Sequence, residues 1–430
     1  MLLDASSTLA ASTTSRQFPF TGTAFFVLFI PKPAKKCYYI YINRFIGGYS
    51  MDRIYRRHQR IWKFLQVICG LLIRSKFDFE HDDFQMEGPV ILISNHVTSW
   101  DPLLVAMSLK KKQVYYVASE HLFRKGFLTR LLTWLVAPIP RSKGNSGADT
   151  VKACLRHLKA GHSVCIFAEG EQSWDGRNNP IFAATGKLVR SSGATLVTYR
   201  LEGAYLCLPR WADKIRKGPI HGHTVGIYAP DTLKAMTADE ITEIISRDIK
   251  ENAWERQLAE PHEYTGKDLA VGLERMLYLC PECRKTGTLS SEGDRLSCSC
   301  GLKLKYRTDG FFEPASPFRD IAQWEDWQSE ALRSGDFVHG EELFGDENVE
   351  LKKIGLGHSE ALILKGGLLQ YEDRLICGER VFFLKDIDSM AMTRSHILLF
   401  SSAGEYYELS SEKGINLRKY LEIWKAQSEK

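Results

Sequence analysis

The chain has 430 residues, of which 44% are hydrophobic and 25% are charged, and its formal net charge is only +5. This length exceeds what one ordinary hydrophobic core holds, so we expect a globular protein of two or three domains. The modest charge argues against a general nucleic-acid binder, and ten cysteines spread over such a length exclude a disulfide scaffold.

The first 76 residues divide at Met51. Residues 1–50 begin rich in Ser and Thr and follow no helix or strand pattern, so they are treated as an uncertain N-terminal extension. One hypothesis is that Met51 is the natural start, which mass spectrometry of the native N-terminus would decide. Residues 51–76 carry seven Lys or Arg and one acidic residue.

That basic segment predicts an amphipathic helix on an anionic membrane surface, with a solvated helix face as the alternative. Its apolar run, Ile61 to Ile73, is interrupted by Lys63 and Gln66 and is too short to span a bilayer. Six cysteines stand singly within apolar runs and read as reduced thiols of a cytosolic protein. We therefore expect a peripheral or interfacial protein at the cytoplasmic face of a membrane.

Short apolar runs then alternate with helical patterns. Buried strands are expected at Pro89–Ser94, Val114–Ala118, Val164–Ala168 and Thr195–Arg200, and helices at Leu122–Leu135 and Thr150–Lys159. This alternation predicts an α/β sandwich with a largely parallel sheet, which forms one domain over residues 51–262.

A compact cysteine module follows at residues 275–310. Two pairs of cysteines, Cys280 with Cys283 and Cys298 with Cys300, offer the four thiolates of a tetrahedral zinc ribbon. Because cysteine fills all four positions, no place is left for a catalytic water, and the expected cofactor is structural zinc. A redox dithiol and an iron–sulfur site are the alternatives. No basic and aromatic stripe surrounds the module, so we expect no nucleic-acid partner.

Residues 345–430 change character again. Several short β-rich runs are followed by a helix from Lys413 to about Gln427. This order predicts a small pleckstrin-homology-like β-barrel with a C-terminal helix. Such a fold does not decide between a lipid adaptor and a protein adaptor.

One polar segment, Asn95 to Pro102, follows directly on the first predicted strand. It places His96 at the carboxyl end of that strand, where α/β proteins hold their chemistry. A histidine is a natural general base, and a carboxylate such as Asp101 can hold one ring nitrogen while the other faces a hydroxyl. The alternative is that the pair only caps a helix.

Two further polar segments occupy comparable places, and together they resemble the PlsC-type glycerolipid acyltransferases. The motif Asn-His-Val-Thr-Ser-Trp-Asp resembles the first block of that family, and Pro140-Arg141 its second. Phe167 to Ser173 resembles the third block, and Val197 to Gly203 lies where the fourth should be. The resemblance covers roughly residues 60–230.

The resemblance implies a 1-acylglycerol-3-phosphate O-acyltransferase-like enzyme of phospholipid biosynthesis. It would move a fatty acyl group from acyl-CoA or acyl-carrier protein to the hydroxyl of a lyso-phospholipid. His96 would take the hydroxyl proton and Asp101 would orient the imidazole. Arg141 would pair with the anionic head of the acceptor, while Glu169 and Gly170 would shape the acceptor site.

The third block departs from the family pattern. The family's Pro, Thr and Arg are replaced by Ala168, Glu171 and Gln172. The lost arginine removes a fork that would bind phosphate through two hydrogen bonds, and Glu171 adds a negative charge. Either the acceptor lacks a phosphate there, or another cation serves, for which the candidates are Arg141, Lys143, Lys187 and Arg190.

Two other readings stay open. One is a non-catalytic lipid-binding or scaffold protein built on an acyltransferase fold, which the altered third block favours and the intact His96–Asp101 pair opposes. The other is a zinc-ribbon regulatory protein whose partner is a nucleic acid or another protein. The sequence predicts no particular oligomeric state.

Overall fold

The computed structural model describes residues 49–83, 87–109, 113–119, 127–141, 147–335, 342–355, 360–411 and 415–428. The chain divides into one unit over Met1–Ile54 and a second over Tyr55–Lys430. The predicted N-terminal extension thus lies almost wholly outside the described residues. The predicted basic helix is present as α2 (Tyr49–Lys76), which buries Trp62 and Ile73.

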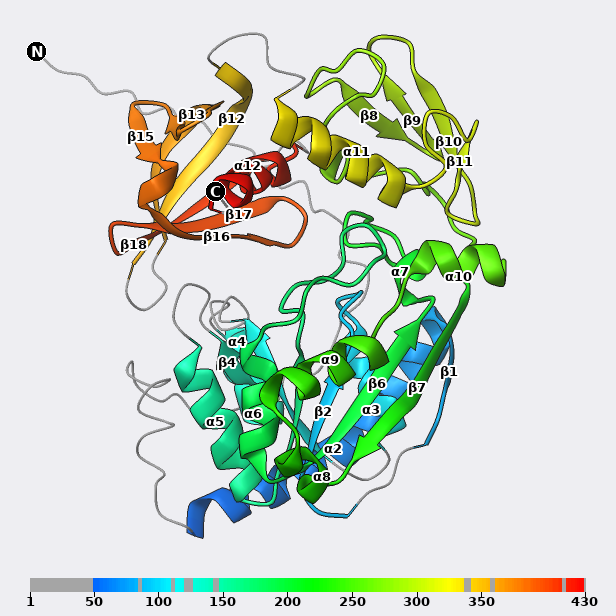
Figure 1. The fold of residues 1–430 in the computed structure, drawn as a ribbon, viewed down its shortest axis with the longest axis vertical. Helices are drawn as coiled ribbons and strands as arrows, with labels where there is room; N and C mark the ends of the chain where they lie inside the picture. The colour runs from blue at the N-terminus through cyan, green and yellow to red at the C-terminus, as the bar shows by residue number, and fades with distance from the viewer. Residues whose placement is uncertain are drawn as a thin grey trace, which may run out of the picture. The chain divides into compact units, whose positions relative to one another are not determined.

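A seven-stranded sheet forms the core of the first domain (Figure 1). Its order is β1-β7-β6-β2-β5-β3-β4, and every pairing is parallel except that of β6 with β7. The largely parallel α/β sheet predicted from the sequence is therefore confirmed. Its strands are β1 (Asp78–His81), β2 (Val90–Ser94), β3 (Val114–Ser119), β4 (Ile139–Arg141), β5 (Ser163–Phe167), β6 (Thr195–Glu202) and β7 (Pro219–Tyr228).

Helices cover both faces of this sheet because alternate residues of the central strand β2 are apolar on both sides. Ile91 and Ile93 join one hydrophobic cluster with α5 (Ala148–Lys159), α6 (Ala184–Ser192) and α9 (Ala238–Asp248). Val90 and Leu92 join the other with α3 (Asp101–Ser108). The remaining helices of this domain are α4 (Phe127–Val136), α7 (Ala204–Cys207), α8 (Pro230–Ala235) and α10 (Ala253–Ala259).

The cysteine module lies beside a four-stranded antiparallel sheet of order β11-β10-β9-β8. Helix α11 (Ile321–Ser334) follows it and buries Trp324, whose indole N–H donates to the Leu279 carbonyl at 2.9 Å. The elements are η2 (Leu273–Arg275), β8 (Leu289–Glu292), β9 (Arg295–Cys298), β10 (Lys303–Tyr306) and β11 (Phe312–Glu313).

A second seven-stranded sheet, wholly antiparallel, forms the C-terminal domain in the order β15-β14-β13-β12-β18-β17-β16. The predicted final helix is present as α12 (Arg418–Ser428), while Lys413 lies outside the described residues. Among the pairings described, none joins β15 to β16, so the closed barrel stays a prediction. The elements are β12 (Glu342–Ile354), β13 (Glu360–Tyr371), β14 (Arg374–Cys377), β15 (Arg380–Phe383), η3 (Leu384–Asp386), β16 (Ile387–Thr393), β17 (Ile397–Ser402) and β18 (Glu405–Ser411).

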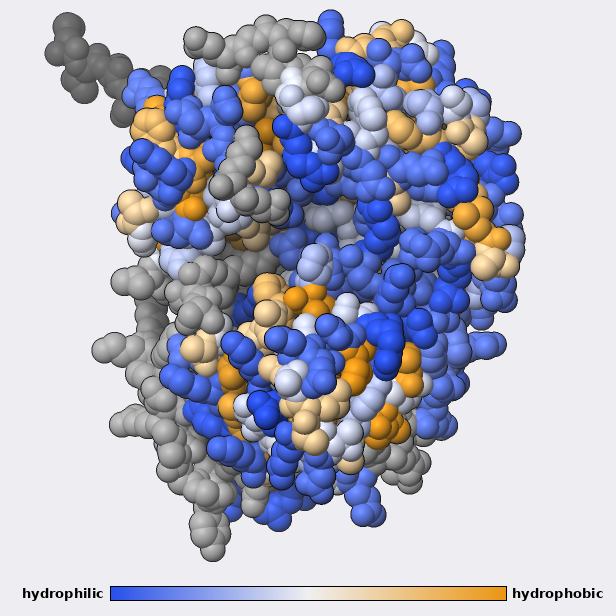
Figure 2. All heavy atoms as spheres, in the orientation of Figure 1, coloured by the Kyte–Doolittle hydropathy of each residue, from blue (hydrophilic) through white to orange (hydrophobic). Residues whose placement is uncertain are grey.

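Figure 2 shows one face of the molecule, on which hydrophilic side chains predominate and hydrophobic ones gather in small groups. In the part of the chain that the structure describes, no helix has the length and apolar character needed to cross a membrane.

Candidate active site

His96 lies in the loop that leaves the carboxyl end of β2. The neighbouring strand β5 runs parallel to β2, with Ser94 in register with Phe167, so both strands end at the same edge of the sheet. The imidazole stacks on the Phe167 ring, with the ring centroids 4.4 Å apart and the planes 21° apart. The side chain of His96 is 19% exposed, which leaves it accessible to a substrate.

The Asp101 carboxylate is fully buried and holds the His96 ring. Oδ2 accepts a hydrogen bond from His96 Nδ1 at 2.7 Å and one from the Val97 N–H at 2.7 Å. Oδ1 accepts from the Thr98 hydroxyl at 2.7 Å. With the proton on Nδ1 directed at Asp101, Nε2 is the ring nitrogen left to receive a proton.

The same contacts speak against a role for this pair in helix capping. Asp101 is the first residue of α3, yet its carboxylate binds the N–H groups of Val97 and Thr98, which precede the helix. The N-cap residue itself, Trp100, makes no side-chain cap hydrogen bond. The carboxylate therefore holds the loop before α3 and the imidazole, and it does not cap the first turn of the helix.

Asn95 fixes the backbone on the other side of His96. Its side-chain amide donates to the Leu201 carbonyl and accepts from the Leu201 N–H, both at 2.8 Å, which ties the end of β2 to β6. The His96 carbonyl accepts from the Ser173 N–H at 2.9 Å. The backbone of His96 is thus held from two neighbouring segments.

Glu169 is a buried carboxyl group that joins two loops. It accepts hydrogen bonds from the His96 N–H at 2.9 Å, from the Asn178 side chain at 2.9 Å and from the Asn179 N–H at 2.6 Å. Burial raises the pKa of Glu169 to about 7, although these donors act in the opposite direction. Glu169 therefore positions the His96 loop against residues 169–179.

Gly170 makes room for the guanidinium of Arg141. Its φ is +72°, and a Cβ atom there would lie 2.5 Å from an Arg141 Nη atom and closer still to the Phe182 ring. Arg141, from β4, lies over the Phe182 ring at 4.2 Å. Burial lowers the pKa of Arg141, and nearby Glu171 acts in the opposite direction.

Three of the predicted residues line one cavity, whereas His96 and Asp101 are not among its lining residues. Arg141, Glu169 and Gly170 all line a cavity of about 450 Å³, and Glu169 also touches His96. Of the other cations proposed from the sequence, Lys187 and Arg190 are exposed on α6 and are not among the lining residues. Lys143 lies outside the described residues.

Arg210 is a site residue that the sequence did not indicate. Its guanidinium lies 3.5 Å from the Glu171 carboxylate, donates to the Gln172 carbonyl at 3.3 Å and stacks on Trp174 at 4.2 Å. Glu171, the acidic residue that differs from the family's third block, is thus paired with Arg210 from another segment of the chain. No motif marks Arg210, so only the fold could reveal this pairing.

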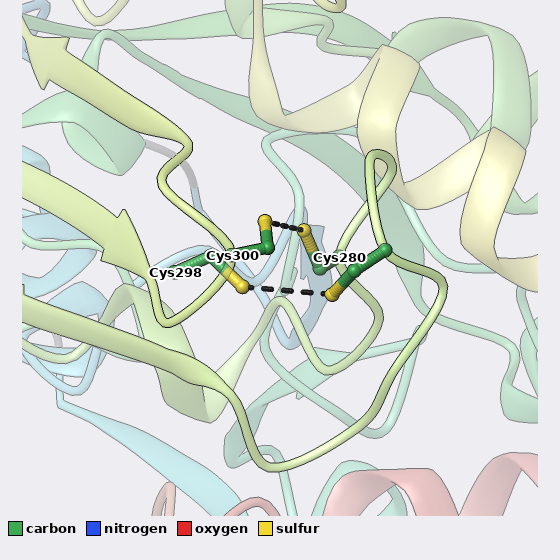
Figure 3. A group of neighbouring side chains, drawn as sticks. Cys280, Cys298 and Cys300 are labelled. Atoms are coloured by element: carbon green, nitrogen blue, oxygen red, sulfur yellow. Dashed lines mark hydrogen bonds between the residues drawn. The ribbon is translucent and has the colours of Figure 1, made fainter.

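The four predicted cysteine ligands also meet, away from this site. Cys280 and Cys300 have Sγ atoms 3.7 Å apart, as do Cys283 and Cys298, and all four lie within 4.8 Å of one another (Figure 3). Zinc–sulfur bonds of about 2.3 Å in a tetrahedron place sulfur atoms roughly 3.8 Å apart. No disulfide bond joins these four cysteines, and their spacing fits a four-thiolate metal site.

Comparison with known proteins agrees with the α/β domain. Residues 76–202 match the family model described as Acyltransferase, so the chain carries a domain of the acyltransferase type. The matched range contains all five predicted residues of the candidate active site. The cysteine cluster and the C-terminal sheet lie outside it.

Two curated plant proteins are similar to this chain. One is the chloroplastic 1-acyl-sn-glycerol-3-phosphate acyltransferase BAT2 of Brassica napus, 26% identical over 183 residues that cover 40% of this chain and 51% of that protein. The other is the chloroplastic 1-acyl-sn-glycerol-3-phosphate acyltransferase LPAT1 of Arabidopsis thaliana, 26% identical over 146 residues, 32% of this chain and 40% of that protein. The chain thus spans about half the length, or less, of the relatives it matches.

Among solved structures, the 1-acyl-sn-glycerophosphate (LPA) acyltransferase PlsC from Thermotoga maritima aligns with a TM-score of 0.33 and 14% identity. The alignment covers 49% of this chain and 86% of that protein.

The raised pKa of Glu169 gives the folded protein a predictable pH dependence. The protonated carboxyl is favoured in the fold, so the stability it contributes is fully present below its ordinary pKa of 4.5 and is lost as the pH rises through about 7. Relative to Glu169→Gln, the wild type should lose roughly 3 kcal/mol over this window. Urea unfolding at several pH values measures the difference, with exposed Glu260→Gln as control. Parallel pH profiles for wild type and Glu169→Gln would contradict the assignment.

Proposed function

We propose that this protein transfers a fatty acyl group from acyl-CoA or acyl-carrier protein to the hydroxyl of a lyso-lipid, 1-acyl-glycerol-3-phosphate, in phospholipid biosynthesis. The observation that carries the proposal is the 2.7 Å contact between His96 Nδ1 and the buried Asp101 carboxylate, inside a domain of the acyltransferase type. Both plant relatives bear the name of an enzyme for this acceptor.

The proposed reaction is a direct transfer. His96 Nε2 takes the proton of the acceptor hydroxyl as its oxygen attacks the thioester carbonyl, and Asp101 stabilises the imidazolium that forms. The tetrahedral intermediate then expels the thiolate of the donor, which takes the proton back from His96, so that the ester and the free thiol are the products. Arg141, which lies beside Gly170, pairs with the anionic head of the acceptor; Lys425 is a second cation among the residues that line the cavity.

Removing the base tests the proposal. His96→Ala should lower acyl transfer by at least about a hundredfold, since it removes both proton transfer and its orientation. Half-exposed His221, on β7, gives the control His221→Ala, which should keep wild-type activity. Transfer is measured from acyl-CoA and from acyl-carrier protein to lyso-lipids with and without a phosphate.

The acceptor panel separates the alternatives. Activity that depends on His96 but is confined to phosphate-free acceptors would reassign the substrate. Lipid binding without any transfer by the wild type would favour the scaffold reading, which the absent third-block arginine supports. Full activity of His96→Ala would refute the catalytic assignment.

We further propose that α2 holds the protein at the cytoplasmic face of a membrane. Phe64, Val67 and Leu71 recur at helical spacing and are 65–67% exposed, and Ile68 and Leu72 extend the same stripe. Apolar side chains on a basic helix suit an interface between anionic head groups and acyl chains. Exposed basic residues flank the stripe, namely Arg53, Arg56, Arg60, Lys63, Arg74 and Lys76.

Charging the stripe should release the protein. The double variant Phe64→Glu with Leu71→Glu should weaken binding to anionic vesicles by at least about tenfold, because each side chain contributes roughly 1.5–3 kcal/mol when buried in an apolar phase. Leu362→Glu, at an equally exposed position on β13, is the matched control. Cosedimentation with anionic and neutral vesicles measures the effect, and unchanged binding would oppose this role for α2.

We assign the cysteine cluster to structural zinc. Four thiolates leave no open position, so the ion would join the loop at Cys280 to the end of β9 at Cys298 rather than act on substrate. The expected content is about one zinc per chain by elemental analysis, and chelation or Cys283→Ser should lower the melting temperature. Cys69→Ser, at a single half-buried thiol of α2, should do neither. Iron in place of zinc, or no metal, would contradict the assignment.

A further inference from the structure

The cavity above Arg141 and Gly170 has a second wall that comes from the C-terminal domain. On the acyltransferase side it is lined by Glu169, Asn179 and Phe182 among others. On the opposite side it is lined by residues of β12, β16, β17, β18 and α12. The cavity is therefore lined both by the acyltransferase-type domain and by the C-terminal domain.

The wall includes core-facing residues of this sheet, Met390, Phe400 and Tyr407, and residues of its opposite face. In β17, Leu398 and Phe400 point into the hydrophobic core of the C-terminal domain, so Leu399 between them points to the opposite face. Ala391 in β16 is directly opposite Leu399, and the pairing of Ile354 with Tyr406 continues along the same face. All four residues line the cavity.

Two apolar side chains of this face are buried, although they lie outside the hydrophobic clusters of the described residues. Leu399 and Ile354 are each 8% exposed, yet neither belongs to the two hydrophobic clusters that the described residues form. Apolar side chains that are withdrawn from solvent but line a cavity are typical of a ligand site, and about 450 Å³ is within the usual range for one.

The altered third block holds this wall in place. Arg210, which pairs with Glu171, also donates from Nη2 to the Met392 carbonyl in β16 at 3.0 Å. A second link joins Arg177 to Asp326 of α11 through two hydrogen bonds, at 3.0 and 2.7 Å. Arg210 thus contacts both Glu171, in the loop beside the candidate site, and the C-terminal sheet, whereas the Arg177 link reaches α11.

We propose that the C-terminal sheet is a wall of the substrate site and that its face at Ala391 and Leu399 contacts the alkyl chain of the lyso-lipid acceptor. The anionic head lies at Arg141, and the alkyl chain extends along the apolar lining residues Ile354, Ala391 and Leu399 of the C-terminal domain. The identity of the acceptor rests on the proposed function, whereas the presence of an alkyl chain against this sheet does not require turnover.

Photolabelling tests the wall directly. The full chain is irradiated with a lysophosphatidic acid that carries a diazirine in its acyl chain, and the modified peptides are identified by mass spectrometry. Labels in β16 and β17 near Ala391 and Leu399 are expected. The proposal would be overturned by labels confined to residues 76–202 or by the absence of labels. It would also be overturned if a diazirine acyl-CoA labelled this face and the lysophosphatidic acid did not. A labelled wall in a protein without transferase activity would instead refute the proposed function.

Narrowing the cavity gives an independent readout. Leu399→Trp should raise KM for long-chain lysophosphatidic acid by about tenfold and leave a short-chain acceptor little changed. Leu362→Trp, exposed on β13 outside the lining residues, should leave both unchanged. Circular dichroism and melting temperature confirm that each variant folds, and Leu399→Ala serves if the larger side chain does not fit. An unaltered chain-length profile in a folded variant would refute the wall.

Discussion

The hydrogen bond from the His96 N–H to the buried Glu169 carboxyl joins the two loops on which the candidate site depends. The parallel pairing of β2 with β5 brings both loops to one edge of the sheet, but it leaves their detailed positions open. Glu169 fixes them, because this buried carboxyl group accepts hydrogen bonds from both loops at once. Asp101 then holds the His96 ring and the N–H groups of the two residues that follow it.

A second carboxylate, Glu171, connects this site to the rest of the chain. By itself it would repel an anionic acceptor, yet Arg210 approaches it and also reaches the backbone of β16. Glu171, which makes the third block unsuited to phosphate binding, therefore pairs with Arg210 instead. Arg141, which Gly170 allows to approach, and Lys425 are the cations among the residues that line the candidate acceptor site.

The features predicted correctly from the sequence are those that depend on residues close together in the chain. The apolar run at Pro89–Ser94 predicted a buried strand, which is β2, and placed His96 at a strand end. The cysteine spacing brought four thiolates together, as the cluster shows. Arg210 and Leu399 escaped prediction because neither stands in a motif. An arginine among many, or a leucine in an alternating strand, acquires a role only from what the fold sets against it.

By itself, the sequence determined the α/β order of the first domain, the His96–Asp101 spacing and the positions of the four clustered cysteines, since each rests on periodicity or on a few adjacent residues. Only the tertiary structure decided that Glu169 bridges two loops, that Glu171 pairs with Arg210, and that residues of the C-terminal domain line the cavity. Those contacts join segments far apart in the chain. Their partners are selected by burial and charge in three dimensions, which leave no pattern along the sequence.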